Sequence, residues 1–422
     1  MFKNKVLVLL FISFIFSLTS CKKEEEKKQS VFPQFLPKEK PNMKLSKAVN
    51  RLYDNYTAVK PQENELFSQF KYTEIKGFDY NNHDGTITRR DPSKIIFNAG
   101  KYYVWYTYRN TSTPPQGAEK SNDTIPSADW DLSEIWYATS KNGFTWEEQG
   151  VAIKRPEKPF VGWRSVSTAD ILVWKGKYYL YYQGFKQASG KRGDDCPVAV
   201  SFADSPNGPW TPYNKEVIPN GEKGSWDQFS IHDPYPLVYK GKIYLYYKSD
   251  FGKTTDWIRM QGLATANNPL GPFTKHPLNP VMSSGHETTL FPFKQGIAAL
   301  AYKDGNEHNT IQFSEDGVNF EIASITELMP IAGAPYIADA FTDTKDGRGI
   351  TWGLSHFIGM GGRGKWHSKL VRFDCDLSLD INDSQMKKST VYHSPEVYMK
   401  QGLNKTQLKR IEEENKKLNL DK

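Results

Sequence analysis

Short runs of apolar and aromatic residues, each interrupted by a polar turn with glycine, recur along most of the chain. In the clearest example an acid, Asp233, precedes an apolar strand over 236–239, a Lys-Gly-Lys turn and an aromatic strand over 243–247. Four more acids open the same pattern elsewhere: Asp91, Asp170, Glu287 and Asp339. The intervals between successive acids are 79, 63, 54 and 52 residues. Repeats of this size, built from short strands and glycine turns, are typical of β-propellers, so five repeats predict an all-β protein with five blades.

A second repeated feature is a turn that combines Ser or Asn, Gly and an aromatic residue. It occurs at 140–146, 205–210 and 314–320, and in a looser form at 268–273. Gly and Asn tolerate the positive φ of hairpin turns, so each copy is expected to join the two outer strands of a blade. The recurrence of these turns supports the repeated organisation, and they indicate no chemistry.

The N-terminus has the pattern of an export signal. Lys3 and Lys5 precede an apolar run over 6–18 that is too short for a stable membrane span, and the run closes on Leu-Thr-Ser-Cys21. This resembles a bacterial lipoprotein signal over 1–20, in which cleavage leaves a lipid on Cys21. The charged segment over 21–43 is expected to be a disordered tether. The chain is thus expected to be an exported lipoprotein of a Gram-negative bacterium, on either face of the outer membrane, with the anchor as its only membrane contact.

The remaining segments divide into a helical piece, the repeats and a tail. Residues 44–60 read as a short helix with Ser46 as its N-cap, within an N-terminal helical segment over 44–66. The repeats fill 67–395, and the charged tail over 396–422 is expected to be a C-terminal helix. The helical segment must dock either on its own propeller or on a neighbouring subunit.

Composition narrows the functional classes only slightly. The formal net charge of +7 is scattered, and neither a basic stripe nor a nucleic-acid motif is present, so nucleic acid is not expected as a partner. Aromatic residues make up 14% of the chain, enough both to fill the space between sheets and to stack on sugar rings. Besides Cys21, only Cys196 and Cys375 are present; they show no metal-binding spacing, and their pairing stays open.

The acids that open the repeats are the candidate chemistry. The first strand of each blade lines the propeller axis, so residues at its start converge on one funnel. Like charges gathered there must set proton affinities or hold a cation, and a divalent cation near the axis is left open. Hydrolysis of a glycosidic bond needs one carboxylate to activate water and one proton donor. Two acids have a histidine directly before them, in His232-Asp233 and His286-Glu287, which adds candidate donors.

These residues resemble glycoside hydrolase family 117. The resemblance rests on Asp91, His232-Asp233 and His286-Glu287 in order, and on Ser46-Lys-Ala-Val-Asn-Arg51, which fits the family's Ser-x-Ala-x-x-Arg motif. It implies a five-bladed propeller that dimerises by exchange of the N-terminal segment. It also implies exo-hydrolysis, with inversion, of the α-1,3 bond that holds 3,6-anhydro-L-galactose at the non-reducing end of neoagaro-oligosaccharides. No cofactor is required by this expectation.

The resemblance assigns Asp91 as general base, Asp233 as an orienting acid, Glu287 as the third acid and His286 as the proposed proton donor. Whether His286 or Glu287 gives the proton stays open from the sequence. The candidate sugar contacts are Thr168, Asp170, Gln183, His232 and His356, with Trp130 or Trp163 as a stacking platform.

Other readings compete with this one. The family contains branches that do not cleave neoagarobiose, so another red-algal oligosaccharide is an alternative substrate. An arabinanase or xylosidase of family 43 type also uses Asp, Asp and Glu from separate blades. A sialidase would need a cluster of arginines, for which Arg89, Arg90 and Arg164 are the obvious candidates. A surface glycan-binding lipoprotein without catalysis is the non-enzymatic alternative.

Overall fold

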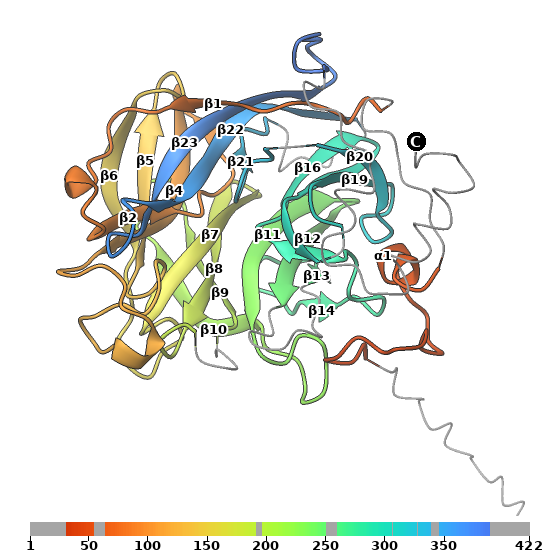
Figure 1. Cartoon of the computed structure of the whole chain (residues 1–422), viewed down its shortest axis with the longest axis horizontal. Helices are drawn as coiled ribbons and strands as arrows, with labels where there is room; N and C mark the ends of the chain where they lie inside the picture. Colours follow the sequence, from red (N-terminus) through yellow and green to blue (C-terminus); the bar gives the residue numbers. More distant parts are fainter. Residues whose placement is uncertain are drawn as a thin grey trace, which may run out of the picture. The chain divides into compact units, whose positions relative to one another are not determined.

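The computed structural model describes residues 31–54, 64–190, 196–249, 260–305, 307–326, 328–338 and 346–388. By their contacts these residues all belong to one compact unit, Val31–Lys422. Almost all of their regular structure is β-strand (Figure 1). The helical elements are short: α1 (Lys47–Arg51) and two 3₁₀ turns, Asn81–His83 and Ala118–Lys120.

Three antiparallel sheets follow one another along the first two thirds of the chain. The first has the order β2-β4-β5-β6, with β3 also paired to β4: β2 (Ile87–Arg90), β3 (Ile96–Asn98), β4 (Lys101–Asn110), β5 (Glu134–Ser140) and β6 (Trp146–Ile153). The second has the order β10-β9-β8-β7: β7 (Ser165–Trp174), β8 (Lys177–Phe185), β9 (Val198–Ala203) and β10 (Thr211–Ile218). The third has the order β11-β12-β13-β14: β11 (Ile231–Tyr239), β12 (Lys242–Ser249), β13 (Met260–Ala266) and β14 (Thr274–Lys275).

The largest sheet joins strands from both ends of the chain. Its order is β1-β23-β22-β16-β17-β19-β20, with β21 on β22: β1 (Lys71–Glu74), β16 (Thr289–Lys294), β17 (Gly296–Ala301), β19 (Thr310–Ser314), β20 (Glu321–Ile325), β21 (Ala334–Pro335), β22 (Gly347–Met360) and β23 (His367–Ser378). Only two residue pairs connect β16 to β22. Strands β15 (Ser284–His286) and β18 (Lys303–Gly305) form a separate ribbon. Since β1 pairs with β23, the first and last described strands complete one sheet.

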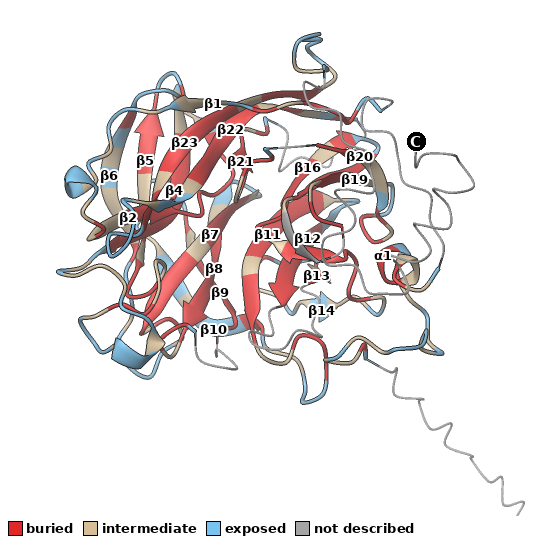
Figure 2. Ribbon diagram, viewed as in Figure 1, coloured by how far each residue is buried: buried red, intermediate tan, exposed pale blue. Residues whose placement is uncertain are grey.

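The core lies between the sheets. Trp105 and Ile135 of the first sheet pack in one cluster with Ile171 and Leu180 of the second. Figure 2 shows the strands mostly buried and the connecting loops exposed. The high aromatic content thus serves largely to fill the wide spaces between neighbouring sheets, because each ring buries much apolar area.

The local patterns predicted from the sequence recur in the structure. The predicted strands over 236–239 and 243–247 lie inside β11 and β12, and each glycine turn joins the third and fourth strands of its repeat. Their glycines all have positive φ, from 72° at Gly143 to 87° at Gly271. Cys196 and Cys375 are both buried, and their thiols donate to the carbonyls of Ile231 at 3.9 Å and Ile350 at 3.7 Å, so the two do not form a disulfide with each other in this structure.

The N-terminal helix is shorter than expected. Ser46 is its N-cap, since its hydroxyl accepts from the backbone N–H of Val49 at 3.3 Å, but the helix ends at Arg51. It packs on its own chain: the Ser46 hydroxyl donates to the carbonyl of Pro280 at 2.6 Å, and Arg51 pairs with Glu307 at 2.7 Å. The rest of the expected helix over 55–60 lies outside the described residues, as do the export signal and the C-terminal tail.

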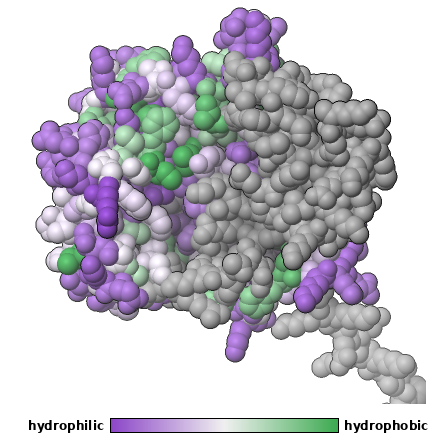
Figure 3. Space-filling model, viewed as in Figure 1, coloured by the Kyte–Doolittle hydropathy of each residue, from purple (hydrophilic) through white to green (hydrophobic). Residues whose placement is uncertain are grey.

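Among the described residues, no helix is both long and apolar enough to cross a membrane. Figure 3 shows one face of the molecule, where hydrophilic residues cover most of the coloured surface around a smaller hydrophobic group.

Candidate active site

The acids of three repeats share one backbone conformation. Asp91, Asp233 and Glu287 have φ of 48°, 50° and 54°, in the left-handed region that costs a non-glycine residue roughly 1–2 kcal/mol. In β11 the register shifts between His232 and Tyr235, so an extra residue is inserted there. Such bulges re-aim a side chain, and strained backbone of this kind concentrates at functional sites.

In the second and fifth repeats, the residue with this backbone conformation is not the acid expected from the sequence. In β7 the register shift falls between Ser167 and Asp170, and the left-handed residue is Thr168, with φ of 49°. In the fifth repeat the left-handed residue before β21 is Ala332, with φ of 47°. Asp170 is therefore not equivalent to the acids of the other three repeats, and Asp339 lies outside the described residues. One inserted residue reverses the alternation of a strand, which sends Asp170 to a different face.

Polar side chains from neighbouring repeats accept hydrogen bonds from the backbone N–H groups of these strained residues. The N–H of Asp91 donates to Nδ1 of His356 at 2.9 Å. Thr107 accepts in the same way from Thr168 at 2.8 Å, and Gln183 from Asp233 at 3.0 Å. Since buried backbone donors must be paired, these contacts compensate part of the cost of the strained backbone.

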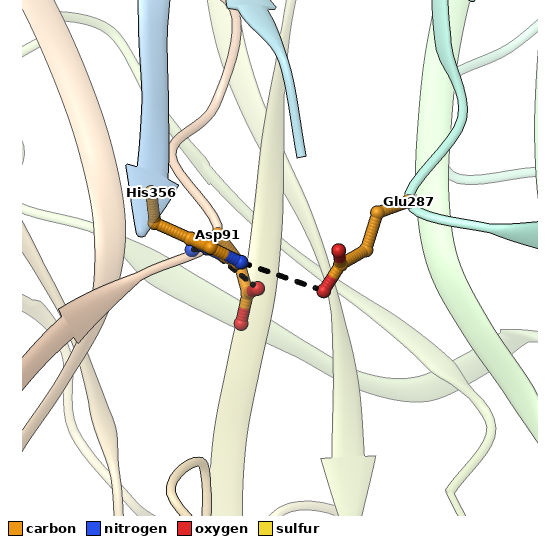
Figure 4. A group of neighbouring side chains, drawn as sticks. All are labelled: Asp91, Glu287 and His356. Carbon is orange, nitrogen blue, oxygen red and sulfur yellow. Dashed lines mark hydrogen bonds and ion pairs between the residues drawn. The ribbon is translucent and has the colours of Figure 1, made fainter. Parts of the chain in front are cut away.

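At the centre of the site, Arg90 bridges two of the acids. Its Nε lies 2.9 Å from Oδ2 of Asp91 and its Nη2 lies 3.1 Å from Oε1 of Glu287. Figure 4 shows the imidazole of His356 between the same two carboxylates, with Nδ1 3.5 Å from Asp91 and Nε2 3.7 Å from Glu287. All four side chains are at least nine-tenths buried, so their charges interact strongly.

Burial and neighbouring charges shift the pKa values of Glu287 and His356. Burial alone would raise the pKa of Glu287, but His286, His356 and Arg90 outweigh burial and hold that pKa well below its ordinary value. Burial, with help from Arg90, lowers the pKa of His356 despite the attraction of Glu287. His356 is thus neutral near pH 7, and because Nδ1 accepts from Asp91, its proton is on Nε2.

The other sequence candidates lie around this centre. Asp233 lies 3.4 Å from the buried ammonium of Lys248 and accepts from the backbone N–H of Glu287 at 3.3 Å. Nε2 of His286, on a partly exposed ring, lies 3.3 Å from Oε1 of Glu287. The hydroxyl of Thr168 donates to Asp91 at 3.2 Å. His232 is buried against Phe185, with ring centroids 5.8 Å apart.

Three candidates have other surroundings. Asp170 is buried and paired with Lys94, whose backbone N–H also donates to it at 2.8 Å, so it is a structural acid rather than a sugar contact. The guanidinium of Arg90 lies 4.8 Å from the ring centre of Trp130, which covers part of that ring. Trp163 contacts the ammonium of Lys158 at 4.0 Å.

Comparison with solved structures decides the family. The structure of Zg3597, a family 117 glycoside hydrolase produced by the marine bacterium Zobellia galactanivorans, is 63% identical in sequence and superposes with a TM-score of 0.75. The match covers 80% of this chain and 99% of that one. The chain belongs to glycoside hydrolase family 117. No protein-family model and no curated protein matches the sequence.

A more distant match adds only the fold. The structure of a BT0996 RGII complex is 12% identical with a TM-score of 0.51, and the match covers 79% of this chain and 95% of that one. The family 117 assignment makes the chain a glycoside hydrolase with a propeller-type fold. It also means that the chain is not a member of family 43.

Sequence reasoning missed two cations of this family 117 site. Arg90 entered only as a candidate for sialidase chemistry, and Lys248 was not considered. A signal was present: Thr107, Gln183 and Lys248 each follow a lysine by six residues at the end of an aromatic strand. A polar residue at the same step of three buried strands indicates a shared role at the strand ends.

Asp91, Glu287 and His356 could also hold a divalent cation. They offer ligand atoms within 4.8 Å of one another, and carboxylate oxygens with an imidazole nitrogen suit zinc. Nε2 of His356 is buried without a hydrogen-bond partner in the described part of the chain, and it would have to lose its proton to bind an ion. Arg90 already pairs with both carboxylates, so an ion would compete with its guanidinium.

Proposed function

We propose that the protein is an exo-acting glycosidase that releases 3,6-anhydro-L-galactose from the non-reducing end of neoagaro-oligosaccharides with inversion. The observation that carries the proposal is the convergence of Asp91, Asp233 and Glu287 from three repeats onto one buried cluster, in a chain of family 117. The strained backbone at all three supports a catalytic role, because strain of this kind persists where function requires it.

Asp91 takes the proton of the attacking water in this proposal. The water oxygen forms the new bond to the anomeric carbon while the glycosidic C–O bond breaks, and the leaving oxygen receives a proton from the enzyme. Asp91 suits the role of base because Arg90, Thr107 and Thr168 all contact its Oδ2 and hold the carboxylate in a fixed position.

His286 is the better candidate for the proton donor. The low pKa of Glu287 makes it a carboxylate at neutral pH, without a proton to give. Oxygen atoms of Asp91 and Glu287 also lie within 4.8 Å, closer than the roughly 6.5–9.5 Å between the carboxyl groups of an inverting pair. The imidazole of His286 lies next to Glu287 and is partly exposed, and histidine is the side chain whose ordinary pKa suits acid catalysis near neutrality.

Product analysis tests the proposal. We expect the soluble protein (22–422) to release 3,6-anhydro-L-galactose from neoagarobiose and neoagarohexaose, but no product from arabinan or carrageenan oligosaccharides. Anomeric configuration followed by NMR immediately after mixing should show inversion. Release only from another red-algal oligosaccharide would place the chain in a divergent branch, and retention would overturn the assigned mechanism.

Asp91→Asn tests the role of the base. Turnover should fall by roughly 100- to 10,000-fold, because the amide cannot accept the proton from water. Asp204→Asn, at an exposed acid whose side chain is 85% accessible, is the control and should keep full activity. Unchanged turnover in Asp91→Asn, with the circular dichroism spectrum intact, would refute the role and favour a different base.

The proposal extends to the assembly. We infer five blades, two of them within the largest sheet, because only two residue pairs connect its halves. A homodimer formed by exchange of the N-terminal segment, and a lipid anchor at Cys21 of an exported protein, complete the proposed organisation.

A further inference from the structure

A pocket of about 450 Å³ lies between the outer strands of the first two sheets. Residues at the end of β6, around 151–156, form one wall, and β9, β10 and the turn that joins them form the other. None of the catalytic acids lines it. Its volume falls within the roughly 300–1,000 Å³ of small-molecule sites.

The floor of this pocket is aromatic and apolar. Trp210, Tyr182 and Val161 line it. Trp210 is held edge-on to the buried Trp105, with ring centroids 5.9 Å apart and an interplanar angle of 88°. An indole fixed in this way offers a rigid surface on which the apolar face of a sugar ring can stack.

The indole N–H of Trp210 lacks an acceptor. Nε1 is buried and has no hydrogen-bond partner within the described ranges. Gly208 lies against this edge of the ring, since a Cβ there would be 3.0 Å from Cδ1 and 3.4 Å from Nε1. Because this nitrogen is closed to solvent, a ligand in the pocket would contact the rest of the indole and not its N–H.

The rim carries positive charge and amides. Lys154, Arg155 and Lys215 line the pocket, and no carboxylate side chain does. Asn214 also lines it and has φ of 58°, at the irregular register between Pro212 and Glu216 in β10. Three cations without a neighbouring acid in the lining favour an anionic ligand.

We propose that this pocket is a second, non-catalytic saccharide site that binds a sugar bearing an anionic group. The aromatic floor stacks on the ring, the Asn214 amide reaches its oxygens, and the lysines and Arg155 pair with a sulfate ester or carboxylate. The site would hold the enzyme on a charged polysaccharide while the acid cluster acts elsewhere. It does not depend on which bond that cluster cleaves.

Direct binding tests the proposal. The soluble protein (22–422) with Asp91→Asn, which should not consume neoagarohexaose, is titrated by calorimetry with a sulfated galactose oligosaccharide, a uronate oligosaccharide and neutral neoagarohexaose. Neoagarohexaose is also present in excess in the titrations with the two anionic probes, to fill the acid cluster. We expect saturable binding of at least one anionic probe under this excess, weakened by added salt. Which anionic probe binds distinguishes sulfate from carboxylate recognition.

Variants locate the binding. Lys154→Gln/Lys215→Gln should weaken it at least tenfold, and Trp210→Phe should weaken it while preserving the apolar floor. Lys177→Gln, at an exposed lysine outside the lining, is the matched control and should bind as wild type. No saturable binding of either anionic probe, or equal binding by the double variant, would overturn the proposal. Turnover at the acid cluster is measured separately and should be unchanged in all three variants.

Discussion

Lys94 and Asp170 form a buried ion pair, whereas the sequence predicts Asp170 as a contact to the sugar. This buried ion pair gives the sharpest test of the structure. The Lys94 side chain is fully buried and that of Asp170 is 6% exposed. Oδ1 of Asp170 accepts from the backbone N–H groups of Lys94 and Ile171, at 2.8 and 2.9 Å, while Oδ2 faces the ammonium. Burial lowers the pKa of Lys94 to about 8 in spite of Asp170. It also raises the pKa of Asp170, although Lys94 opposes this shift.

Removing one charge should cost more than removing both. Lys94→Met leaves a buried carboxylate without its cation, which destabilises a protein by roughly 3–5 kcal/mol. In Lys94→Met/Asp170→Asn no charge remains, and the Asn oxygen still accepts from both backbone N–H groups. Most of the loss should therefore be recovered, so that Asp170→Asn stabilises the Lys94→Met protein although it destabilises the wild type.

Urea unfolding at pH 7, followed by tryptophan fluorescence and circular dichroism, measures all four proteins. Equal destabilisation by Asp170→Asn in both backgrounds would refute the pairing argument. The Michaelis constant of Asp170→Asn should match that of wild type, because its carboxylate contacts Lys94 and not the sugar. A large rise in the Michaelis constant with unchanged stability would restore Asp170 as a sugar contact.

Three further predictions concern the site and the assembly. The folded pKa of Glu287 lies below its usual 4.5, so its contribution to stability is fully present above that pH and is lost as the pH falls through the folded value. Glu287→Gln should therefore lower stability at pH 7 and flatten its decline between pH 5 and 3 in urea titrations; an unchanged decline would contradict the assigned ionisation. His356→Leu removes the acceptor of the Asp91 N–H and should cost roughly 1–3 kcal/mol, whereas His356→Gln, which imitates Gln183, should cost less; equal losses in thermal unfolding would exclude this role. Deleting 44–60 should give a monomer by light scattering, and a persistent dimer would rule out exchange of that segment.

Much of this fold could be predicted because its signals are local. The strand over 243–247 alternates aromatic and aliphatic residues, and the turn at 140–146 contains a glycine with positive φ, so both elements can be recognised from a few neighbouring residues. The acids Asp91, Asp233 and Glu287 were found in the same way, since each opens its repeat at the step where the strand begins.

The sequence by itself therefore determined the repeated strands, their turns and three of the acids at the centre. Only the tertiary structure decided that Thr168, and not Asp170, is the counterpart of the three acids in the other repeats. The reason is that a single inserted residue in β7 changes which face of the strand each later side chain occupies. It also decided that Arg90 joins Asp91 to Glu287, residues that are 196 positions apart in the sequence. The residue pattern of one strand does not show which charged side chains of other repeats will lie beside it in the fold. In this protein such neighbouring charges lower the pKa of Glu287.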